Sequence, residues 1–442
     1  MIGRYDKVMD KNQFALTPPM GWNSWDCYGA SVREDEVRGN AEYMAKNLKQ
    51  FGWEYVVVDI QWYEPKAYSC DYRPFAELEM DEYSRVVPAT NRFPSAINGA
   101  GFKPLADYVH SLGFKFGIHI MRGIPRQAVH RNAKLLGTDI TAREIAYTNS
   151  ICRWNTDMYG VDPEKEGAAI YYDSLFELYA SWGVDYVKVD DSSCAEIGDI
   201  PYFAGEIELI RKAIDKCGRD IVLSLSPGPT PLEFAEHVKA NANMWRMTGD
   251  YWDRWTDLFS EFERCNNWSP HVGPGHWADA DMLPVGHIGI RTDPNDLGKG
   301  RMTQFTKDEQ ITMLTLWCIF RSPLMVGCEL RDNDEWTLSL LTNTEVLRVL
   351  NHSSEGKQLY RRDNKIVWTA KDEDGSYYIA LFNTGEEADN VEVLLKDINI
   401  EGTYICRDLW KHEELEKVSD RLELEVVSHG ARLIKLSKNF QF

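Results

Sequence analysis

The chain has 442 residues, a formal net charge of −20 and an aromatic content of 12%. Its length exceeds what one hydrophobic core usually accommodates, so we expect two domains. So acidic a protein is a poor ligand for nucleic acid or for an anionic membrane surface, and both are excluded as partners. The nine cysteines show no metal-ligand spacing, so neither a disulfide framework nor a zinc site is predicted.

The N-terminal stretch MIGRYDKVMDKNQFALTPP lacks the apolar core of a signal peptide, and no apolar run is long enough to span a bilayer. These features predict a reduced, soluble protein of the cytoplasm that does not bind membranes. Aromatic residues in the C-terminal part would permit a homo-oligomer.

Over roughly the first three-quarters of the chain, short β-branched strands alternate with amphipathic helices. Apolar side chains at helical spacing end at Gly52 and again at Gly183, which are predicted helix stops. Eight such strands predict a (β/α)8 barrel rather than a doubly wound sheet, because no glycine-rich phosphate loop follows the first strand. The predicted strands are Pro19–Asn23, Tyr55–Asp59, Lys115–Ile120, Tyr186–Asp190, Ile221–Ser226, Met244–Arg246, the stretch around Trp277–Leu283, and Leu324–Val326.

The pattern changes after about Asn351, where short alternating strands and turn signals predict an antiparallel β domain. We therefore divide the chain into a catalytic barrel, residues 1–350, and a β domain, residues 351–442. The segment from Arg122 to Ala168 is predicted to be a loop insertion of the barrel that shapes a substrate pocket. The strands predicted in the β domain are Lys365–Thr369, Tyr377–Phe382, Val391–Leu394, Tyr404–Asp408, Leu422–Val427 and Ala431–Leu436.

Polar side chains gather at the C-terminal ends of the predicted barrel strands. A single Asp at such a place is more often a helix cap than a catalyst, but in a βα barrel this end carries the active site. The convergence of polar residues at six strand ends therefore indicates an active site. These residues are Asp59, His119, Lys188, Asp190, Ser226, Arg246, Asp250, Asp279 and Asp281.

Two of these carboxylates have the surroundings that glycoside hydrolysis needs. In YVKVDD, Lys188 and Asp190 share one face of a strand, and a neighbouring cation lowers a carboxyl pKa, which suits a nucleophile. Asp250 precedes Tyr251 and Trp252, an environment that could raise its pKa for acid–base work. A structural ion pair of Lys188 with Asp190, and a capped loop at Asp250, are alternatives that the spacing leaves open.

The sequence resembles glycoside hydrolase family 27, the α-galactosidase or melibiase family of clan D. The resemblance covers nearly the whole chain and runs in order through LTPPMGWNSW, VVVDIQW, KFGIHI, YVKVDD, WRMTGD, GHWADADML and RSPLMVG. It implies a (β/α)8 TIM barrel followed by an antiparallel β-sandwich. It further implies a retaining exo-glycosidase without metal or organic cofactor, with Asp190 as nucleophile and Asp250 as general acid/base.

The resemblance also implies how an oligosaccharide or glycoside substrate would be held. Trp25 would stack on the apolar face of the sugar, and Asp59 would accept hydrogen bonds from its hydroxyls. Lys188 and Arg246 would bind ring hydroxyls, and Asp281 belongs to the same substrate-binding set. Retention of configuration predicts a separation of roughly 5–5.5 Å between the two catalytic carboxyls.

One departure from the family pattern bears on the sugar. Ile60 stands where α-galactosidases carry the second of two adjacent aspartates, which helps bind the C6 hydroxyl of galactose. An apolar side chain disfavours a hydroxyl there, and β-L-arabinopyranose lacks that exocyclic CH₂OH group. The family includes β-L-arabinopyranosidases with this replacement, and the chain resembles them. We therefore predict hydrolysis of terminal β-L-arabinopyranosides with weaker action on α-D-galactosides, unless Ile60 points into the barrel wall.

Further departures leave alternatives open. Ser226 stands where α-galactosidases place a Glu, and relatives acting on N-acetylgalactosamine also have Ser, so an α-N-acetylgalactosaminidase remains an alternative beside an α-galactosidase. Ser192 replaces a disulfide cysteine of many secreted members, in agreement with an intracellular protein. His119 replaces the usual Tyr and is predicted to be packed and hydrogen-bonded. A sugar-binding protein without activity is the alternative of another class.

Overall fold

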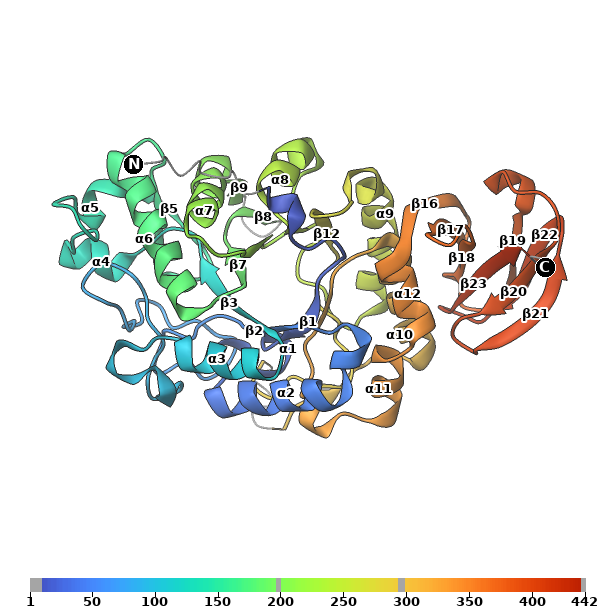
Figure 1. Cartoon of the computed structure of the whole chain (residues 1–442), viewed down its shortest axis with the longest axis horizontal. Coiled ribbons are helices and arrows are strands. Elements are labelled where there is room, and N and C mark those ends of the chain that lie inside the picture. Colours follow the sequence, from blue (N-terminus) through green and yellow to red (C-terminus); the bar gives the residue numbers. More distant parts are fainter. Residues whose placement is uncertain (1–9, 196–199, 293–298, 439–442) are drawn as a thin grey trace, which may run out of the picture.

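The computed structural model describes residues 10–195, 200–292 and 299–438. Its first part is a parallel sheet curled on itself and wrapped in helices, and its last part is an antiparallel β domain (Figure 1). The helix α12 (Thr344–His352) is the last element before the β domain. No helix in the described part of the chain is long and apolar enough to cross a membrane.

Eight parallel strands form the curled sheet, in the order β12–β11–β10–β7–β3–β2–β1–β15. Leu283, just after β12, pairs in parallel with Val326 of β15, and its N–H donates to the carbonyl of Met325 at 2.8 Å. This bridge joins the two edge strands, so the predicted (β/α)8 barrel is confirmed. The strands are β1 (Met20–Asn23), β2 (Tyr55–Val58), β3 (Lys115–Met121), β7 (Tyr186–Asp190), β10 (Val222–Leu225), β11 (Met244–Arg246), β12 (Trp277–Asp279) and β15 (Leu324–Val326).

Helices on the outside of the barrel connect successive strands. Gly52 and Gly183 adopt left-handed φ values of 93° and 85° just after helical segments, which is the conformation of a helix stop. The main outer helices are α2 (Glu34–Asn47), α3 (Lys103–Ser111), α6 (Glu166–Trp182), α7 (Ala204–Lys216), α8 (Ala235–Asn241), α9 (Trp255–Trp268), α10 (Lys307–Phe320) and α11 (Glu335–Leu341).

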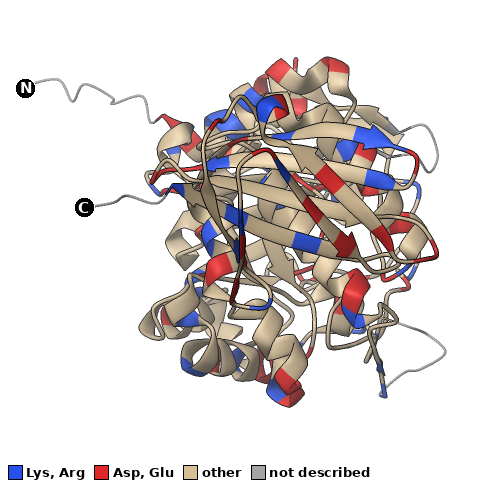
Figure 2. Cartoon of the chain, turned by 90° about the vertical axis from the view of Figure 1, so that its right-hand side faces the viewer, with Lys and Arg blue, Asp and Glu red and all other residues tan. Residues whose placement is uncertain are grey.

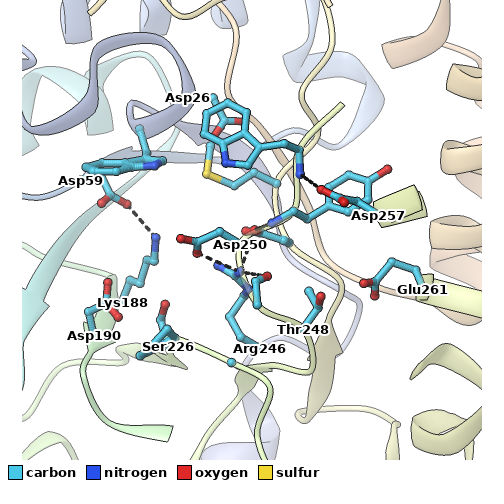
Figure 3. Close-up of a pocket in the computed structure, with 18 of the residues that line it drawn as sticks. Asp26, Asp59, Lys188, Asp190, Ser226, Arg246, Thr248, Asp250, Asp257 and Glu261 are labelled. Carbon is cyan, nitrogen blue, oxygen red and sulfur yellow. Dashed lines mark hydrogen bonds and ion pairs between the residues drawn. The ribbon is translucent and has the colours of Figure 1, made fainter. Parts of the chain in front are cut away.

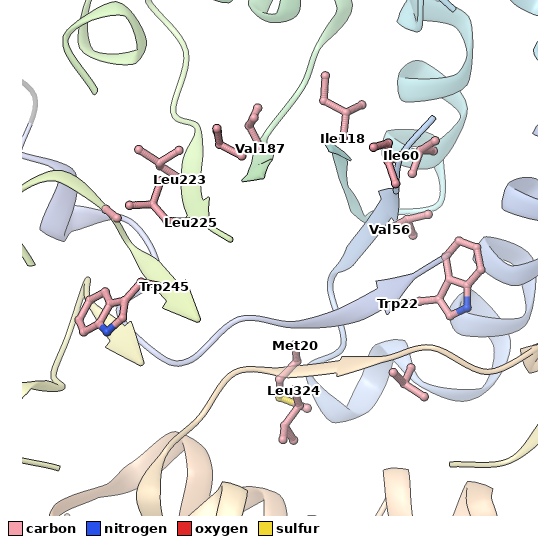
Figure 4. Packing of buried hydrophobic residues seen from close by; sticks show 14 of the residues in the cluster. Met20, Trp22, Val56, Ile60, Ile118, Val187, Leu223, Leu225, Trp245 and Leu324 are labelled. Atoms are coloured by element: carbon pink, nitrogen blue, oxygen red, sulfur yellow. The ribbon is translucent and has the colours of Figure 1, made fainter. Parts of the chain in front are cut away.

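Side chains point alternately outward and inward along each barrel strand, so one set packs in the core and the other set faces the inside of the barrel. Val187 and Val189 of β7 point outward into the apolar layer shared with the helices, whereas Tyr186, Lys188 and Asp190 point into the barrel. Figure 4 shows the outward layer around Val56, Ile118, Val187, Leu223 and Trp245. Inside the barrel, a second apolar cluster packs between the strands, and the polar side chains stand at the strand ends. It includes Tyr55, Val57, Tyr186, Val222, Met244, Met282 and Met325.

The insertion between β3 and β7 carries more structure than the predicted loop. It holds a three-stranded sheet and two short helices, because its sequence contains alternating and capped segments of its own. These elements are β4 (Ile124–Pro125), α4 (Arg126–Arg131), α5 (Ala142–Ile145), β5 (Ala146–Ile151) and β6 (Met158–Val161). Shorter pieces elsewhere are α1 (Trp25–Tyr28), β8 (Ser193–Ala195), β9 (Ile200–Tyr202), β13 (His287–Ile288) and β14 (Arg301–Met302).

The β domain consists of two antiparallel sheets that enclose an apolar core, so the predicted sandwich is confirmed. Seen from the side of this domain, acidic and basic residues are interspersed along its strands (Figure 2). One sheet has the order β16–β17–β18–β23–β20–β21 and the other pairs β19 with β22. Their bounds are β16 (Ser353–Arg362), β17 (Lys365–Asp372), β18 (Tyr377–Asn383), β19 (Asp389–Leu394), β20 (Tyr404–Asp408), β21 (Glu413–Val418), β22 (Arg421–Val426) and β23 (Ala431–Lys438).

Candidate active site

A cavity of about 590 Å³ lies at the carboxyl ends of the barrel strands. All nine site residues predicted from the sequence line it, and they come from segments that are far apart along the chain. Figure 3 shows Asp59 and Lys188 at one end of this cavity and Glu261 at the other, with Arg246 and Asp250 between them. The nine residues are Trp25, Asp59, Ile60, Lys188, Asp190, Ser226, Arg246, Asp250 and Asp281.

Asp190 is held at both carboxylate oxygens at the end of β7. The N–H of Asp191 donates to Oδ1 at 2.9 Å, and Nε2 of His119 lies 3.1 Å from Oδ2. Burial alone would raise the pKa of Asp190, but the hydrogen bond from His119 and the nearby charges, Lys188 among them, bring it below the usual value. The carboxyl is therefore ionised, although its side chain is only 13% exposed.

Lys188 forms its ion pair with Asp59 rather than with Asp190. Its Nζ lies 3.1 Å from Oδ2 of Asp59, which also accepts a hydrogen bond of 2.7 Å from Nδ2 of Asn23. Burial lowers the pKa of Lys188, but the charges of Asp59 and Asp190 outweigh it and raise the pKa above the usual value. In the structure Lys188 thus pairs with Asp59 instead of the Asp190 considered from the sequence, since its side chain reaches past β3 to the end of β2, two strands away.

Arg246 is a buried cation that faces two carboxylates. Its Nη2 lies 2.7 Å from Oδ2 of Asp281 and 3.3 Å from Oδ1 of Asp250. Asp250 itself is on the open side of the cavity, with 77% of its side chain exposed. The apolar environment considered for Asp250 from the sequence is not found, because this carboxyl is exposed while the neighbouring Tyr251 is buried, with 3% exposure.

Several carboxyls around the cavity are buried, and nearby cations do not fully offset the effect of burial on their pKa. Burial raises the pKa of Asp281, even though Arg246 works against it, and raises the pKa of Asp279 below it to about 6. Asp26 also lines the cavity, and burial together with the charge of Asp281 raises its pKa well above the usual value. The cavity thus holds ionised carboxylates beside carboxyls that keep their protons more readily.

The two residues that depart from the family pattern both reach the cavity. Ile60 follows Asp59 directly and is 1% exposed, so it packs in the outer core and also forms part of the cavity wall. Ser226 stands at the end of β10, and its small side chain leaves space beside Asp190 and Arg246. Neither residue places a carboxylate where the family pattern has one.

Several residues that line the cavity escaped the sequence reasoning, Asp26, Tyr72 and Trp154 among them. His119, predicted to be packed and hydrogen-bonded, is fully buried and contacts Asp190. Tyr72 and Trp154 belong to the segments after β2 and β3, whose path no hydrophobic periodicity predicts. Asp26 follows Trp25 in GWNSWD, and that adjacency was the available signal. Within residues 10–195, 200–292 and 299–438, no group of three His, Cys, Asp or Glu side chains is arranged to hold a metal ion.

The chain matches two protein-family models along most of its length. Residues 17–163 and 163–352 match a model described as α-galactosidase A, and residues 362–436 match one described as the α-galactosidase C-terminal β-sandwich domain. The chain belongs to glycoside hydrolase family 27. It is therefore a glycoside hydrolase with a carbohydrate substrate, built as the resemblance implied.

Several relatives of this glycoside hydrolase are known. A β-L-arabinopyranosidase from Geobacillus stearothermophilus is 63% identical, with a TM-score of 0.95 over 98% of this chain and 99% of that one. A Bacillus halodurans protein provisionally assigned as an α-N-acetylgalactosaminidase is 55% identical, with a TM-score of 0.87 over 96% and 98% of the two chains. An α-galactosidase from Cyamopsis tetragonoloba is 28% identical over 98% of this chain and 89% of its own length.

Proposed function

We propose that this enzyme removes terminal β-L-arabinopyranosyl residues from oligosaccharides or glycosides, with retention of configuration and weaker action on α-D-galactosides. The observation that carries the proposal is Ile60, an apolar side chain beside Asp59 in the cavity wall. The Geobacillus relative is a β-L-arabinopyranosidase, and a second structure of that enzyme holds arabinose.

In the proposed mechanism, the carboxylate of Asp190 attacks the anomeric carbon while the bond from that carbon to the leaving oxygen breaks. Asp250 gives its proton to the leaving oxygen, so the aglycone departs as an alcohol. Water then attacks the same carbon, Asp250 takes a proton from it, and the ester bond to Asp190 breaks. The lowered pKa of Asp190 supports its role as nucleophile. The open position of Asp250 supports a group that meets first the aglycone and then water.

The remaining predicted residues would hold the terminal sugar. Lys188 and Asp59 form a donor and acceptor pair that can bind adjacent ring hydroxyls, and Arg246 with Asp281 forms a second such pair. Trp25 presents a partly exposed indole to the cavity and is suited to stack on the apolar face of the ring.

Ile60 would set the preference between a pentopyranoside and a hexopyranoside. A galactoside brings an exocyclic hydroxyl to the side chain at this position, and a hydroxyl buried against an isoleucine loses hydrogen bonds to water without replacing them. Losing one polar contact is worth about 1–3 kcal/mol, or about one to two decades in kcat/KM. Ile60→Asp should move the preference toward the galactoside by that amount.

The test compares kcat/KM on p-nitrophenyl β-L-arabinopyranoside and p-nitrophenyl α-D-galactopyranoside for wild type and Ile60→Asp. Ile60→Val is the matched control, because it keeps an apolar wall and should retain the preference of the wild type. A wild type that prefers the galactoside, or an unmoved ratio in Ile60→Asp, would contradict the proposal.

Ser226 favours a second candidate, an α-N-acetylgalactosaminidase. Its small side chain leaves room for a larger group at C2 of the sugar, and the Bacillus halodurans relative carries that assignment. Ile60 argues against it, because N-acetylgalactosamine also carries the exocyclic hydroxyl. Turnover of p-nitrophenyl N-acetyl-α-D-galactosaminide above that of the arabinopyranoside would establish this candidate instead.

Asp190→Ala separates an enzyme from a sugar-binding protein without activity. The variant should lose turnover of the arabinopyranoside while it still binds the sugar, because the groups around Lys188 and Arg246 remain. Turnover and calorimetric binding, measured on wild type and variant, check this. Equal turnover in both would remove Asp190 from its proposed role. A cytoplasmic location and a homo-oligomeric state stay predictions.

A further inference from the structure

The cavity is larger than the terminal sugar requires. Its volume of about 590 Å³ falls in the range that encloses a drug-sized ligand, and one pentopyranose ring fills only part of that space. Of the residues proposed to hold the terminal sugar, Asp59 and Lys188 lie with Asp190 at one end of the cavity, and Arg246 lies in its middle (Figure 3). The cavity therefore has space for part of the leaving group beside the terminal sugar.

Three aromatic rings form a continuous series along the wall of the cavity. Tyr72 stacks almost parallel to Trp25, with ring centroids 6.2 Å apart and an interplanar angle of 9°. Trp154 follows, with its centroid 5.2 Å from that of Tyr72 and an angle of 52°. All three side chains line the cavity and are partly exposed to it. The aromatic surface therefore extends two rings beyond Trp25.

Tyr72 lines the cavity together with the two proposed catalytic carboxyls, Asp190 and Asp250. Burial and then the charges of Asp190, Asp59 and Asp250 raise the pKa of Tyr72 well above the usual value, which agrees with a ring on the same cavity as these carboxylates. Trp154, the next ring in the series, extends the aromatic wall beyond Tyr72.

The loops that carry the two rings are tied to each other. The N–H of Phe75 donates to Oγ1 of Thr156 at 2.8 Å, which joins the Tyr72 loop to the Trp154 loop. Gln61 adds a second link, because its Nε2 donates to Oδ2 of Asp157 at 2.5 Å. The rings are thus fixed before a ligand arrives, which lowers the entropy cost of binding.

We propose that Tyr72 and Trp154 form a subsite for the leaving group, and that its ligand is a second sugar ring linked to the terminal residue. The proposal rests on the proposed hydrolase function and names the aglycone class. A sugar ring offers an apolar face of C–H groups that packs on aromatic rings. It also carries hydroxyls, and polar side chains such as Thr248 and Arg254 line the same cavity, which a plain aromatic aglycone could not use as hydrogen-bonding partners.

The test compares kcat/KM for a disaccharide of β-L-arabinopyranose and a second pentose with kcat/KM for methyl β-L-arabinopyranoside. The methyl group is too small to reach Trp154, so methyl β-L-arabinopyranoside serves as the reference substrate. Trp154→Ala should lower the ratio of disaccharide to methyl glycoside about three- to tenfold, the range measured for loss of one aromatic contact. Trp154→Phe keeps a flat face and should recover part of that loss.

Tyr147→Ala is the matched control, because Tyr147 belongs to the same insertion and is 52% exposed outside the cavity. In Tyr147→Ala the ratio of kcat/KM for the disaccharide to kcat/KM for the methyl glycoside should stay within twofold of the wild-type ratio. A ratio in Trp154→Ala as high as in Tyr147→Ala, with both substrates still hydrolysed, would overturn the subsite. So would a loss confined to phenyl β-L-arabinopyranoside, which would assign the rings to an aromatic leaving group.

Failure of the hydrolase function would look different, because wild type would then cleave neither substrate. The subsite is also tested by binding alone. In Asp190→Ala protein, calorimetric titration should show that Trp154→Ala weakens the disaccharide at least threefold more than the methyl glycoside. Equal weakening of both ligands overturns the subsite whatever the turnover.

Discussion

Asp190 and His119 form a contact whose direction follows from elementary chemistry. An ionised carboxylate can only accept hydrogen bonds, so Nε2 of His119 carries the proton in the 3.1 Å contact with Oδ2. His119 is fully buried, and its Nδ1 has no hydrogen-bond partner among the described residues. Among the described residues, the ring therefore hydrogen-bonds only to Asp190, and this bond orients the proposed nucleophile and supports its charge.

His119→Phe should shift the acid limb of the pH profile. Removing the donor takes away one cause of the lowered pKa of Asp190, so that pKa rises and a higher pH is needed to ionise the nucleophile. We expect kcat/KM to fall by about one to two decades near neutral pH, the cost of one hydrogen bond to a charged group. The profile of kcat/KM against pH reports the free enzyme and is the measurement.

His119→Gln is the control for this prediction, because an amide nitrogen can replace Nε2 as donor. It should recover part of kcat/KM and hold the acid limb nearer its wild-type position. An acid limb that is the same in His119→Phe as in wild type would show that the contact does not influence the nucleophile.

At the scale of residues, the sequence predicted which side chains of a strand face the inside of the barrel. The alternation in YVKVDD places Lys188 and Asp190 inside the barrel, and both line the cavity. It did not predict the partner of Lys188, because Asp59 stands at the end of β2, two strands away, and alternation along one strand does not define such a pair. The exposure of Asp250 was also beyond reach, since this residue lies past the end of β11 on irregular backbone.

Arg122 connects three elements behind Asp190. It follows β3, and its Nη2 lies 2.6 Å from Oδ2 of Asp191, next to the end of β7. Its Nη1 lies 2.5 Å from Oε1 of Glu206 on α7. The N–H of Asp191 in turn binds Oδ1 of Asp190. A single buried guanidinium thus positions the backbone that supports the proposed nucleophile.

Arg122→Met should destabilise the protein by about 3–5 kcal/mol, because it leaves Asp191 and Glu206 buried without their cation. The activity of the folded fraction should fall as well, since Asp191 adopts φ 60° and loses the bonds that fix it. The free energy of unfolding in urea is the measurement. Lys212→Met on α7 is the control, because its pair with Glu208 is exposed and should contribute little. Equal losses in both variants would contradict the role of Arg122.

At the scale of elements, strands with a buried face were predictable and exposed ones were not. The predicted Tyr186–Asp190, Met244–Arg246, Leu324–Val326 and Tyr404–Asp408 coincide with β7, β11, β15 and β20. The edge strands β16 and β21 were missed, because nearly all their side chains are polar and at least partly exposed. Without a buried face, a strand shows no alternation, and only pairing with its neighbour defines it.

The barrel and the β domain share one apolar cluster. Phe262 of α9 packs edge to face on Phe382 of β18, with ring centroids 5.0 Å apart. At its rim, Trp255 of α9 stacks on His429 at 3.7 Å, and Thr312 of α10 donates to the carbonyl of His429. We propose that the boundary between residues 350 and 351 divides the chain into two folds but not into two independently stable parts. The contact between the barrel and the β domain is apolar inside and polar at its edge, so the two parts should unfold together.

Asp372 of β17 forms an ion pair between the two parts of the chain. Arg348 of α12 donates to it through Nε at 2.9 Å and Nη2 at 2.8 Å, Lys435 of β23 donates at 2.8 Å, and the hydroxyl of Tyr378 also binds it. Its side chain is fully buried. Burial alone would raise the pKa of Asp372, but the donors from Arg348, Lys435 and Tyr378 outweigh it and lower the pKa.

A lowered pKa in the folded state makes the contribution of Asp372 depend on pH. It is fully present above the unfolded pKa of about 3.9 and is lost as pH falls through the folded value. Asp372→Asn should therefore reduce the free energy of unfolding by about 1–3 kcal/mol at pH 7, and the difference from wild type should narrow below about pH 4. Urea unfolding at several pH values measures this. Asp389→Asn, which breaks an exposed pair with Lys365, should leave stability nearly unchanged. A difference that is constant with pH would mean that packing, rather than charge, stabilises the contact between the two domains.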